Sequence, residues 1–459
     1  MPRTAGAFSF YVCGPTVYDV PHLGHGRSVL VFDVLRRYVE ATGLAVVHVA
    51  NITDVDDKII QRAQQEDRTA AAVAGQFEEL WWDVVDRLGA LRPTRAPRAT
   101  EYVGHMIDLI GELVAAGAAY ETPGGVYLAT GSVPGYGLLA HQQLDELRTG
   151  ARVEVDEHKQ SPTDFALWRR DEPSAAAPAW PSPWGPGRPG WHTECVVMSL
   201  DLLGEGFDLH GGGLDLRFPH HENERAQAVA LGREFAHVWM HHGFVEVEGE
   251  KMSKSLGNFT SLVDLLDRTD ARAFRLLVLR SHYRSPLEVT PASVADAETA
   301  LGRLDAVARR FPEALSVGAG LPRQGAGPTG GETVVDEAEI AGFQSSMDDD
   351  LDTPAAVSRM FDLIRRANAT ADAGDGAAAL RLAATVVVIA RTLGLEPRGP
   401  QPGAGQADDE ATDLIRRRDA ARAARDFTAA DALRDELHER GWIVEDGPEG
   451  TRVRRDPSS

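Results

Sequence analysis

The N-terminal part of the chain alternates between short apolar runs and segments with helical spacing. The apolar runs 8–13 and 45–50 have the length and residue types of buried strands. Between them, apolar residues recur with helical spacing over 23–41, and a second helical pattern, which contains Lys58 and Arg62, follows the second run. This order of strand, turn, helix, strand and helix predicts the start of a parallel α/β sheet.

The α/β pattern is interrupted and later resumes. Helical spacing prevails over 69–116, and 126–155 has the pattern of short strands and turns with one helix. The stretch 175–189 is rich in Pro, Ala and Gly, which is typical of a loop. Strand-like and helical segments return over 190–279, so we expect an insertion within the sheet domain.

The C-terminal part is almost wholly helical from about residue 292 onward. Two Gly/Pro-rich stretches, 316–331 and 399–406, divide it, and the last unit combines a helical hairpin pattern with a strand hairpin over 442–454. We therefore predict an α/β fold with a Rossmann-like parallel-sheet domain, an inserted connective domain, a helical domain and a small C-terminal unit. The expected bounds are 1–290 for the sheet domain, about 100–189 for its insertion, 291–398 for the helical domain and 407–459 for the terminal unit.

Composition and charge narrow the class of protein. The 459 residues are 43% hydrophobic and 25% charged, as in soluble globular proteins. We find no run of about 18 apolar residues, and residues 1–6 lack the pattern of a signal peptide, so we expect a cytoplasmic protein without a membrane span. The formal net charge of −22 argues against a general nucleic-acid binder but is compatible with a local basic strip.

A first candidate for chemistry is the turn His22-Leu23-Gly24-His25, between a predicted strand and a helix start. A helix N-terminus offers unpaired N–H groups and a partial positive charge, which suit a phosphate. Gly24 allows a flat base or sugar to approach the backbone, and both imidazoles can face the phosphates and donate hydrogen bonds as charge develops. The alternative interpretation is a His-rich helix cap.

A second candidate is the polar segment Lys251-Met252-Ser253-Lys254-Ser255. Its two ammonium groups could balance the charge of a leaving pyrophosphate; the alternative is an exposed basic turn. An H-x-G-H turn followed much later by K-M-S-K-S, across an interrupted α/β sheet, resembles the class I aminoacyl-tRNA synthetases. The resemblance implies that the two motifs bind ATP and promote attack of an amino-acid carboxylate on the α-phosphate. The implied catalytic residues are His22, His25, Lys251 and Lys254.

Four dispersed residues form a candidate metal set: Cys13, Cys195, His220 and Glu224. Thiolate, imidazole and carboxylate are common zinc ligands, and a helix that started at Pro219 would place His220 and Glu224 on one face. Cys13 lies just before the turn 14–24 that contains His22 and Gly24, here called the phosphate turn, so a metal there would lie beside the ATP site. Spacing alone leaves the alternatives open. Cys13 and Cys195 could be small buried side chains, His220 a helix cap and Glu224 a solvated surface charge. A disulfide is not expected in a cytoplasmic chain.

Four segments resemble cysteinyl-tRNA synthetases: Y-V-C-G-P-T-V-Y-D at 11–19, N-I-T-D-V-D-D-K at 51–58, G-W-H-T-E-C at 190–195 and F-P-H-H-E-N-E at 218–224. The resemblance runs through nearly the whole chain. It implies one Zn²⁺ per chain, held by the candidate metal set. It also implies that the sulfur of the substrate cysteine binds the same ion. It implies an amino-acid pocket at Thr53, Trp191 and His210. It implies ATP, with Mg²⁺, at Pro15, Thr16, His22, Gly24, His25 and Lys254.

The implied zinc explains how such an enzyme rejects serine. Pocket shape discriminates poorly between near-isosteres, whereas zinc prefers a thiolate to a neutral hydroxyl. A thiol bound there would ionise, and an editing site would be unnecessary. Four protein ligands normally close a zinc site, so we expect either a fifth ligand position or a looser ligand, for which Glu224 is the candidate.

The resemblance also implies anticodon recognition by the helical part. The segment D-D-D-L-D-T-P at 348–354 resembles the entry to one of its helices, and its alternative role is a helix N-cap. Arginines of the terminal unit could contact RNA or form a solvated, ion-paired helix face. These arginines are Arg416, Arg417, Arg418, Arg422, Arg425, Arg452, Arg454 and Arg455.

The partners implied are cysteine tRNA, L-cysteine and ATP, with no membrane, and a monomer is expected. Two rival functions remain open at this stage. One is a ligase that transfers activated cysteine to glucosaminyl-inositol, as in mycothiol biosynthesis. The other is a catalytically inactive paralogue that binds tRNA.

Overall fold

The computed structural model describes residues 2–140, 159–172, 174, 177–246, 261–318, 321, 335–399, 409–424, 426–447 and 450–455. The predicted segment 251–255, with Lys251 and Lys254, lies outside these residues, as do Arg425 and most of the two Gly/Pro-rich stretches. The chain divides into two compact units, Met1–Val307 with Glu313–Pro397 and Ala308–Pro312 with Arg398–Ser459.

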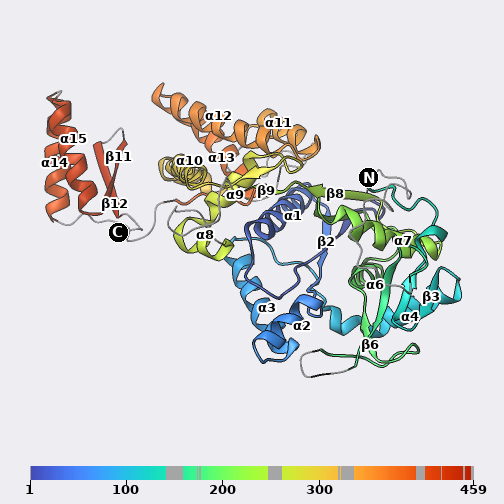
Figure 1. The fold of residues 1–459 in the computed structure, drawn as a ribbon. Helices are drawn as coiled ribbons and strands as arrows, with labels where there is room; N and C mark the ends of the chain where they lie inside the picture. Colours follow the sequence, from blue (N-terminus) through green and yellow to red (C-terminus); the bar gives the residue numbers. More distant parts are fainter. Residues whose placement is uncertain are drawn as a thin grey trace. The chain divides into compact units, whose positions relative to one another are not determined.

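The first unit contains a parallel sheet with strand order β2-β1-β7-β8. Its two outer strands, β2 and β8, are labelled in Figure 1. Its strands are β1 (Ala7–Val12), β2 (Ala45–Ala50), β7 (Leu209–Gly213) and β8 (Val238–His242). The first two confirm the strands predicted from the apolar runs, with β1 displaced by one residue. Because β1 lies between β2 and β7, the loops that follow β1 and β7 leave a crevice at the carboxyl ends of the strands, where ligands bind in such sheets.

Helix α1 (Leu23–Ala41) connects β1 to β2 and matches the predicted helix at both ends. Its buried face includes Leu30, Val34 and Tyr38, which recur at the spacing of one helix face. The second strand is followed by α2 (Asp57–Gln65) and α3 (Ala70–Arg87). After α3 the chain forms isolated parallel bridges to the β2 side of the sheet, through Arg95 and Arg98, where helix was expected.

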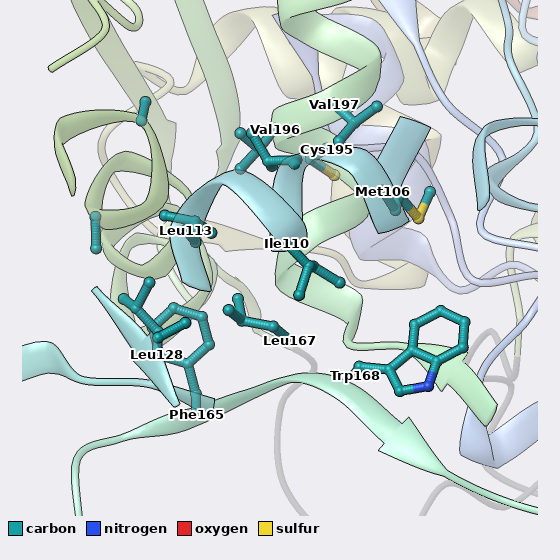
Figure 2. Close-up of a cluster of buried hydrophobic side chains, with 14 of the residues drawn as sticks. Met106, Ile110, Leu113, Leu128, Phe165, Leu167, Trp168, Cys195, Val196 and Val197 are labelled. Atoms are coloured by element: carbon teal, nitrogen blue, oxygen red, sulfur yellow. The ribbon is translucent and has the colours of Figure 1, made fainter. Parts of the chain in front are cut away.

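The insertion carries a second, antiparallel sheet with strand order β3-β4-β5-β6. These strands are β3 (Ala119–Thr122), β4 (Gly125–Leu128), β5 (Phe165–Arg170) and β6 (Gly187–Pro189), so the end of the stretch expected to be a loop is a strand. The associated helical segments are η1 (Ala99–Tyr102), α4 (Val103–Ala115), η2 (Thr130–Ser132) and α6 (Trp191–Leu203). Figure 2 shows the core that they share, in which Ile110 and Leu113 of α4 lie close to Val196 of α6.

The rest of the first unit is mainly helical, as predicted. After η3 (Arg217–His221) and α7 (Glu222–Ala230), the short parallel strands β9 (Val245–Glu246) and β10 (Leu287–Glu288) pair. The helices that accompany and follow them are α8 (Leu262–Arg268), α9 (Ala271–Arg280), α10 (Pro291–Arg310), α11 (Glu337–Asp348), α12 (Thr353–Asp372) and α13 (Gly376–Thr392), with η5 (Pro312–Ser316) after α10. A buried ion pair between Asp33 of α1 and Arg275 of α9, 2.5 Å apart, ties this region to the sheet domain.

The second unit contains the predicted helical hairpin and strand hairpin. Helices α14 (Asp409–Ala423) and α15 (Phe427–Glu439) precede the antiparallel strands β11 (Trp442–Gly447) and β12 (Gly450–Arg455). Leu414, Leu433, Leu437 and Trp442 form its core. Across the described part of the chain, none of the helices combines the length and the apolarity that a membrane crossing requires.

Candidate active site

The carboxyl end of β1 places Cys13 between two neighbouring segments. The backbone N–H of Cys13 donates to the carbonyl of Gly211, 3.3 Å away, and that of Gly14 donates to Asn51 Oδ1, 2.9 Å away. A Cβ on Gly14 would lie only 1.6 Å from the Asn51 carbonyl oxygen, so glycine is required for this close approach. The thiol of Cys13 is thereby fixed over the crevice.

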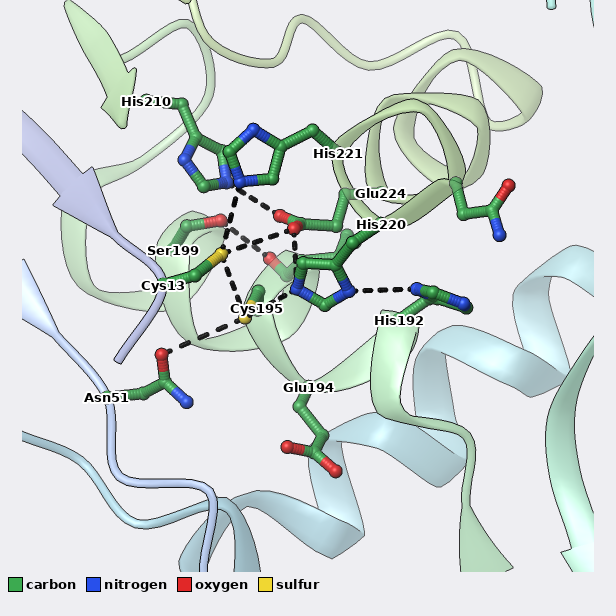
Figure 3. Close-up of polar contacts among 12 residues, drawn as sticks. Cys13, Asn51, His192, Glu194, Cys195, Ser199, His210, His220, His221 and Glu224 are labelled. Carbon is green, nitrogen blue, oxygen red and sulfur yellow. Dashed lines mark hydrogen bonds and ion pairs between the residues drawn. The ribbon is translucent and has the colours of Figure 1, made fainter. Parts of the chain in front are cut away.

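The structure brings the four predicted metal ligands together (Figure 3). The two sulfur atoms of Cys13 and Cys195 are 3.6 Å apart, and His220 Nε2 is 3.6 Å from the sulfur of Cys195. Glu224 Oε1 lies 3.4 Å from the sulfur of Cys13 and 3.0 Å from His220 Nε2. All four ligand atoms lie within 4.8 Å of one another, so they could hold one metal ion.

The local structure that carries His220 is helical from Pro219 onward. Phe218 has extended backbone angles, φ −141° and ψ 133°, because a residue before proline is disfavoured in the helical region. Pro219, His220 and His221 follow in the short helical segment η3, which runs directly into α7 at Glu222. His220 and Glu224 are therefore one turn apart on one face, as a helix that started at Pro219 would place them.

A second layer of imidazoles surrounds the candidate ligands. His210 Nε2 is 2.7 Å from Glu224 Oε2, and His192 Nδ1 is 2.8 Å from His220 Nδ1. His221 Nε2 is also 3.4 Å from the sulfur of Cys13, so Cys13, His210, His221 and Glu224 form an overlapping set. His210 contacts Oε2 of Glu224, whereas Cys13 and His220 lie near Oε1, so His210 is placed to orient Glu224 from its other oxygen.

Burial controls the charge of the cluster. It raises the pKa of the Cys13 and Cys195 thiols, and the neighbouring Glu224 carboxylate raises both further. Burial also lowers the pKa of His220, which neighbouring imidazoles lower more. Two thiols and a carboxyl group crowded into a buried space favour the binding of a cation, because its positive charge balances the negative charge that they carry when ionised.

The H-x-G-H turn is both a helix cap and a pair of aligned donors. The backbone N–H of His25 donates to His22 Nδ1, and that of His22 donates to His25 Nδ1, at 3.3 and 3.2 Å. Burial and nearby positive charge lower the pKa of His25 to about 3, and burial lowers that of His22. Both rings are therefore neutral near pH 7. Because Nδ1 accepts in each, the proton sits on Nε2, which can donate to an anion.

A cavity of about 470 Å³ is lined both by His22, Gly24 and His25 and by Cys13 of the candidate metal set. Trp191 lines it and stacks on His220, with ring centroids 3.8 Å apart, so one side chain contacts both regions. Three further residues with charged side chains, Asp33, Lys58 and Asp215, also line it; sequence reasoning gave them no role, although Lys58 ends one of the recognised segments. The predicted residues found along its wall are Cys13, Pro15, Thr16, His22, Gly24, His25 and Trp191.

The other two predicted pocket residues lie elsewhere in the described structure. Thr53 is buried, and its hydroxyl donates to Glu194 Oε2, 3.2 Å away. His210 is buried against Glu224. Neither side chain lines the cavity in the described part of the chain, so their contact with an amino acid stays a prediction.

The residues predicted to face RNA have mixed surroundings. Arg416 pairs with Asp413 at 2.6 Å, which fits the ion-paired helix face. Arg418 is buried, and its guanidinium donates to Thr451 Oγ1 of β12, so it has a role in packing the terminal unit. The side chains of Arg452, Arg454 and Arg455 fall outside what the structure describes.

The parallel sheet, the H-x-G-H turn at its switch point and the adjoining cavity are the features of a class I aminoacyl-tRNA synthetase. The chain matches the family model "tRNA synthetases class I (C) catalytic domain" over residues 2–299. It is similar in fold to the methionyl-tRNA synthetase of Mycobacterium tuberculosis in complex with methionyl-adenylate, with a TM-score of 0.59, 16% identity, and coverage of 84% of this chain and 89% of that one.

Longer similarities identify the family. The chain is 46% identical to the cysteine–tRNA ligase of Alkalilimnicola ehrlichii, over 99% of this chain and 96% of that protein. It is 44% identical to that of Halorhodospira halophila, with the same coverage. Residues 342–396 match the DALR domain, and 404–454 match the cysteinyl-tRNA ligase anticodon binding domain. The chain belongs to the cysteine–tRNA ligase family.

Proposed function

We propose that this chain is a cysteine–tRNA ligase. It activates L-cysteine with ATP to cysteinyl-adenylate, releases pyrophosphate and transfers cysteine to the 3′ end of cysteine tRNA. The observation that carries the proposal is the convergence of Cys13, Cys195, His220 and Glu224 beside the phosphate turn, in a chain similar to cysteine–tRNA ligases along its whole length.

The first step needs a cradle for the triphosphate. The carboxylate oxygen of cysteine attacks the α-phosphorus, the bond from that phosphorus to the bridging oxygen breaks, and the electron pair leaves with pyrophosphate. The Nε2–H groups of His22 and His25 can donate to the phosphate oxygens as their charge grows, helped by the N-terminus of α1. The ammonium groups of Lys251 and Lys254 are proposed to balance the leaving group.

Zinc is the metal that best suits the cluster. Tetrahedral zinc, with bonds of about 2.3 Å to sulfur and 2.0–2.2 Å to nitrogen or oxygen, separates two sulfurs by about 3.8 Å, sulfur and nitrogen by about 3.6 Å, and nitrogen and oxygen by about 3.4 Å. The corresponding separations here are 3.6, 3.6 and 3.0 Å. The mixed thiolate, imidazole and carboxylate set supports zinc over magnesium or calcium, which prefer oxygen ligands.

When bound, zinc supplies a Lewis acid that favours the substrate's thiolate over the hydroxyl of serine. Glu224 is the ligand suited to loosen, because His210, 2.7 Å from its second oxygen, offers that carboxylate a partner besides the metal. Trp191, which contacts both the cavity and His220, is placed to orient the amino acid, with Thr53 and His210 as further proposed contacts.

The remaining assignments are part of the same proposal. Residues 1–290 form the catalytic domain, with the insertion at about 100–189; 291–398 and 407–459 bind the tRNA. The match to an anticodon binding domain supports this assignment over a ligase for glucosaminyl-inositol. The neutral, aligned donors His22 and His25 favour an active enzyme over an inactive paralogue.

The deciding experiment is aminoacylation of cysteine tRNA by the purified full chain before and after zinc removal, with cysteine-dependent ATP–pyrophosphate exchange measured in parallel. We expect both activities to fall on removal and to return with Zn²⁺ but not with Mg²⁺ alone. Exchange without aminoacylation, together with transfer to glucosaminyl-inositol, would establish the rival ligase. Absence of exchange in the zinc-loaded protein would establish the inactive paralogue.

A further inference from the structure

Arg27, two residues after His25, is a buried cation that binds backbone rather than a carboxylate. It lies on α1 and is 1% exposed. Its Nη1 donates to the Phe244 carbonyl at 2.7 Å, and its Nη2 donates to the carbonyls of Tyr283 at 3.0 Å and Ser285 at 2.5 Å. Among the described residues no carboxylate pairs with it, and burial lowers its pKa to about 10, so it stays charged near pH 7.

One of the carbonyls that Arg27 binds, that of Phe244, belongs to a segment that lines the cavity. Gly243, Phe244 and Val245 line the cavity, as do His22, Gly24 and His25 of the H-x-G-H turn. The N–H of Gly243 donates to the Tyr283 carbonyl, and that of Leu287 donates to the Phe244 carbonyl, at 2.8 and 2.9 Å. These bonds join the segment 243–245 to the segment 283–287, and Arg27 ties both segments to the first turns of α1.

The segment 283–285 is also anchored on its other side. The Tyr283 hydroxyl donates to Asp350 Oδ1 at 2.6 Å, and Arg284 donates to both oxygens of Asp350, at 2.5 and 2.8 Å. Asp350 lies in the turn between α11 and α12, within the region that matches the DALR domain. The segment 283–285 therefore connects the helical region with Arg27. Its side chains bind Asp350, and its carbonyls accept from Arg27.

The turn that presents Asp350 is held in an unusual conformation. Asp350 and Leu351 both have φ of +53°, which is rare for side-chain-bearing residues and a marked outlier for leucine. Neighbouring acids fix it: Asp348 accepts from the Tyr38 hydroxyl of α1 at 2.5 Å, and Asp352 caps α12. The helix N-cap considered for this acidic segment therefore applies to Asp352, whereas Asp348 and Asp350 bind the sheet domain.

We propose that Arg27 and Asp350 form one tether that sets the position of the cavity wall 243–245 and thereby the affinity for ATP. Both are positioning residues, since they act through backbone carbonyls and the segment 283–285. This inference rests on the proposed function, because it takes the nucleotide to be ATP. The tether extends the nucleotide site from α1 to the helical region.

Cysteine-dependent ATP–pyrophosphate exchange without tRNA tests the tether. Arg27→Lys keeps the charge but lacks the fork by which Nη1 and Nη2 bind two separate segments, and Asp350→Asn removes the charge that holds Arg284. We expect the KM for ATP to rise about tenfold or more in Arg27→Lys and a few-fold in Asp350→Asn, as hydrogen bonds to charged groups are lost. The KM for cysteine and the zinc content should change less than about twofold, since the metal cluster lies on other elements.

Two matched controls separate positioning from general loosening. Arg391 also donates to backbone carbonyls, those of Leu315 and Val317, and Glu339 also accepts from two arginines, but both belong to the helical region alone. Arg391→Lys and Glu339→Gln should leave the KM for ATP unchanged at equal loss of thermal stability. Asp350→Glu should recover part of the affinity, because it restores the charge.

The outcomes are distinguishable. In the double variant the rise in KM should be smaller than the product of the single effects, since both residues act through 283–285. Unchanged ATP affinity in Arg27→Lys, equal rises for ATP and cysteine, or fully multiplicative effects would each overturn the tether. If Arg27→Lys fails to fold, the Asp350 variants decide. If the wild-type protein lacks exchange, the proposed function fails, and ATP binding measured by calorimetry decides the tether alone.

Discussion

Replacement of Cys195 by serine tests the proposed metal centre at its most buried ligand. Cys195 is 1% exposed on α6, and its sulfur lies 3.6 Å from both the sulfur of Cys13 and Nε2 of His220. A serine hydroxyl fits this space but remains protonated near neutral pH, so it is a poor zinc ligand. We expect Cys195→Ser to weaken zinc binding, to lower cysteine activation and to reduce the preference for cysteine over serine.

The size of the effect follows from the four-ligand geometry. Zinc binding to structural sites contributes about 10–16 kcal/mol, which is about 2.5–4 kcal/mol for each of four ligands. At about 1.4 kcal/mol per tenfold change, the loss of one thiolate should weaken zinc binding by two to three orders of magnitude. Since cysteine is selected through the same ion, the ratio of kcat/KM for cysteine over serine should fall in parallel.

Zinc affinity is measured by competition with a chromogenic chelator, and selectivity by ATP–pyrophosphate exchange with each amino acid. Val196→Thr is the matched control, because it introduces a buried hydroxyl on the same helix without removing a ligand. It should lower stability while leaving zinc affinity and selectivity intact. Unchanged zinc content together with unchanged cysteine-dependent exchange in Cys195→Ser would refute the assignment of this cluster.

Three further predictions concern residues beside the site. Arg275→Met should lower the free energy of unfolding by about 2–3 kcal/mol, because it removes the 2.5 Å partner of buried Asp33 and leaves Arg37, 2.8 Å away, as its remaining ion-pair partner; urea unfolding measures this, and recovery in a double variant with Asp33→Asn would support it. Burial raises the pKa of Asp33, but Arg275 and Arg37 lower it by more, so the pKa in the folded protein lies below the usual value. The stabilisation by ionised Asp33 is therefore present above about pH 4 and is lost as the pH falls through the folded pKa. The stability difference between wild type and Asp33→Asn should therefore shrink in acid; a constant difference would contradict this. His210→Ala should weaken zinc binding about 10–100-fold by freeing Glu224, as judged by chelator competition.

Local patterns predicted much of the fold. The helix over 23–41 was predictable at both ends because its apolar face and His22 cap are encoded within a few residues. The segment after α3 was not, since its bridges to the β2 side depend on residues far away in sequence. The convergence of His220 and Glu224 was predictable because Pro219 holds Phe218 in an extended conformation, and helical backbone runs from Pro219 into α7.

The site was predictable only where the family resemblance named residues. Cys13 and Cys195 are separated by 182 positions, and spacing alone left their partners open. The tether through Arg27 joins segments more than 200 residues apart, and a lone arginine on an amphipathic helix gives no signal of buried carbonyls. Arg418 was grouped with surface arginines because helix spacing cannot reveal that its guanidinium bonds to Thr451 of β12.

The core shown in Figure 2 means that the insertion is not a detachable module. Val196 and Val197, which follow Cys195 directly, pack into the same cluster as Ile110 and Leu167 of the insertion. A truncation or redesign of that region would shift the backbone that carries a proposed metal ligand, and selectivity for the amino acid would change without any alteration to the pocket itself. Engineering of the insertion therefore has to preserve the register between α4 and α6.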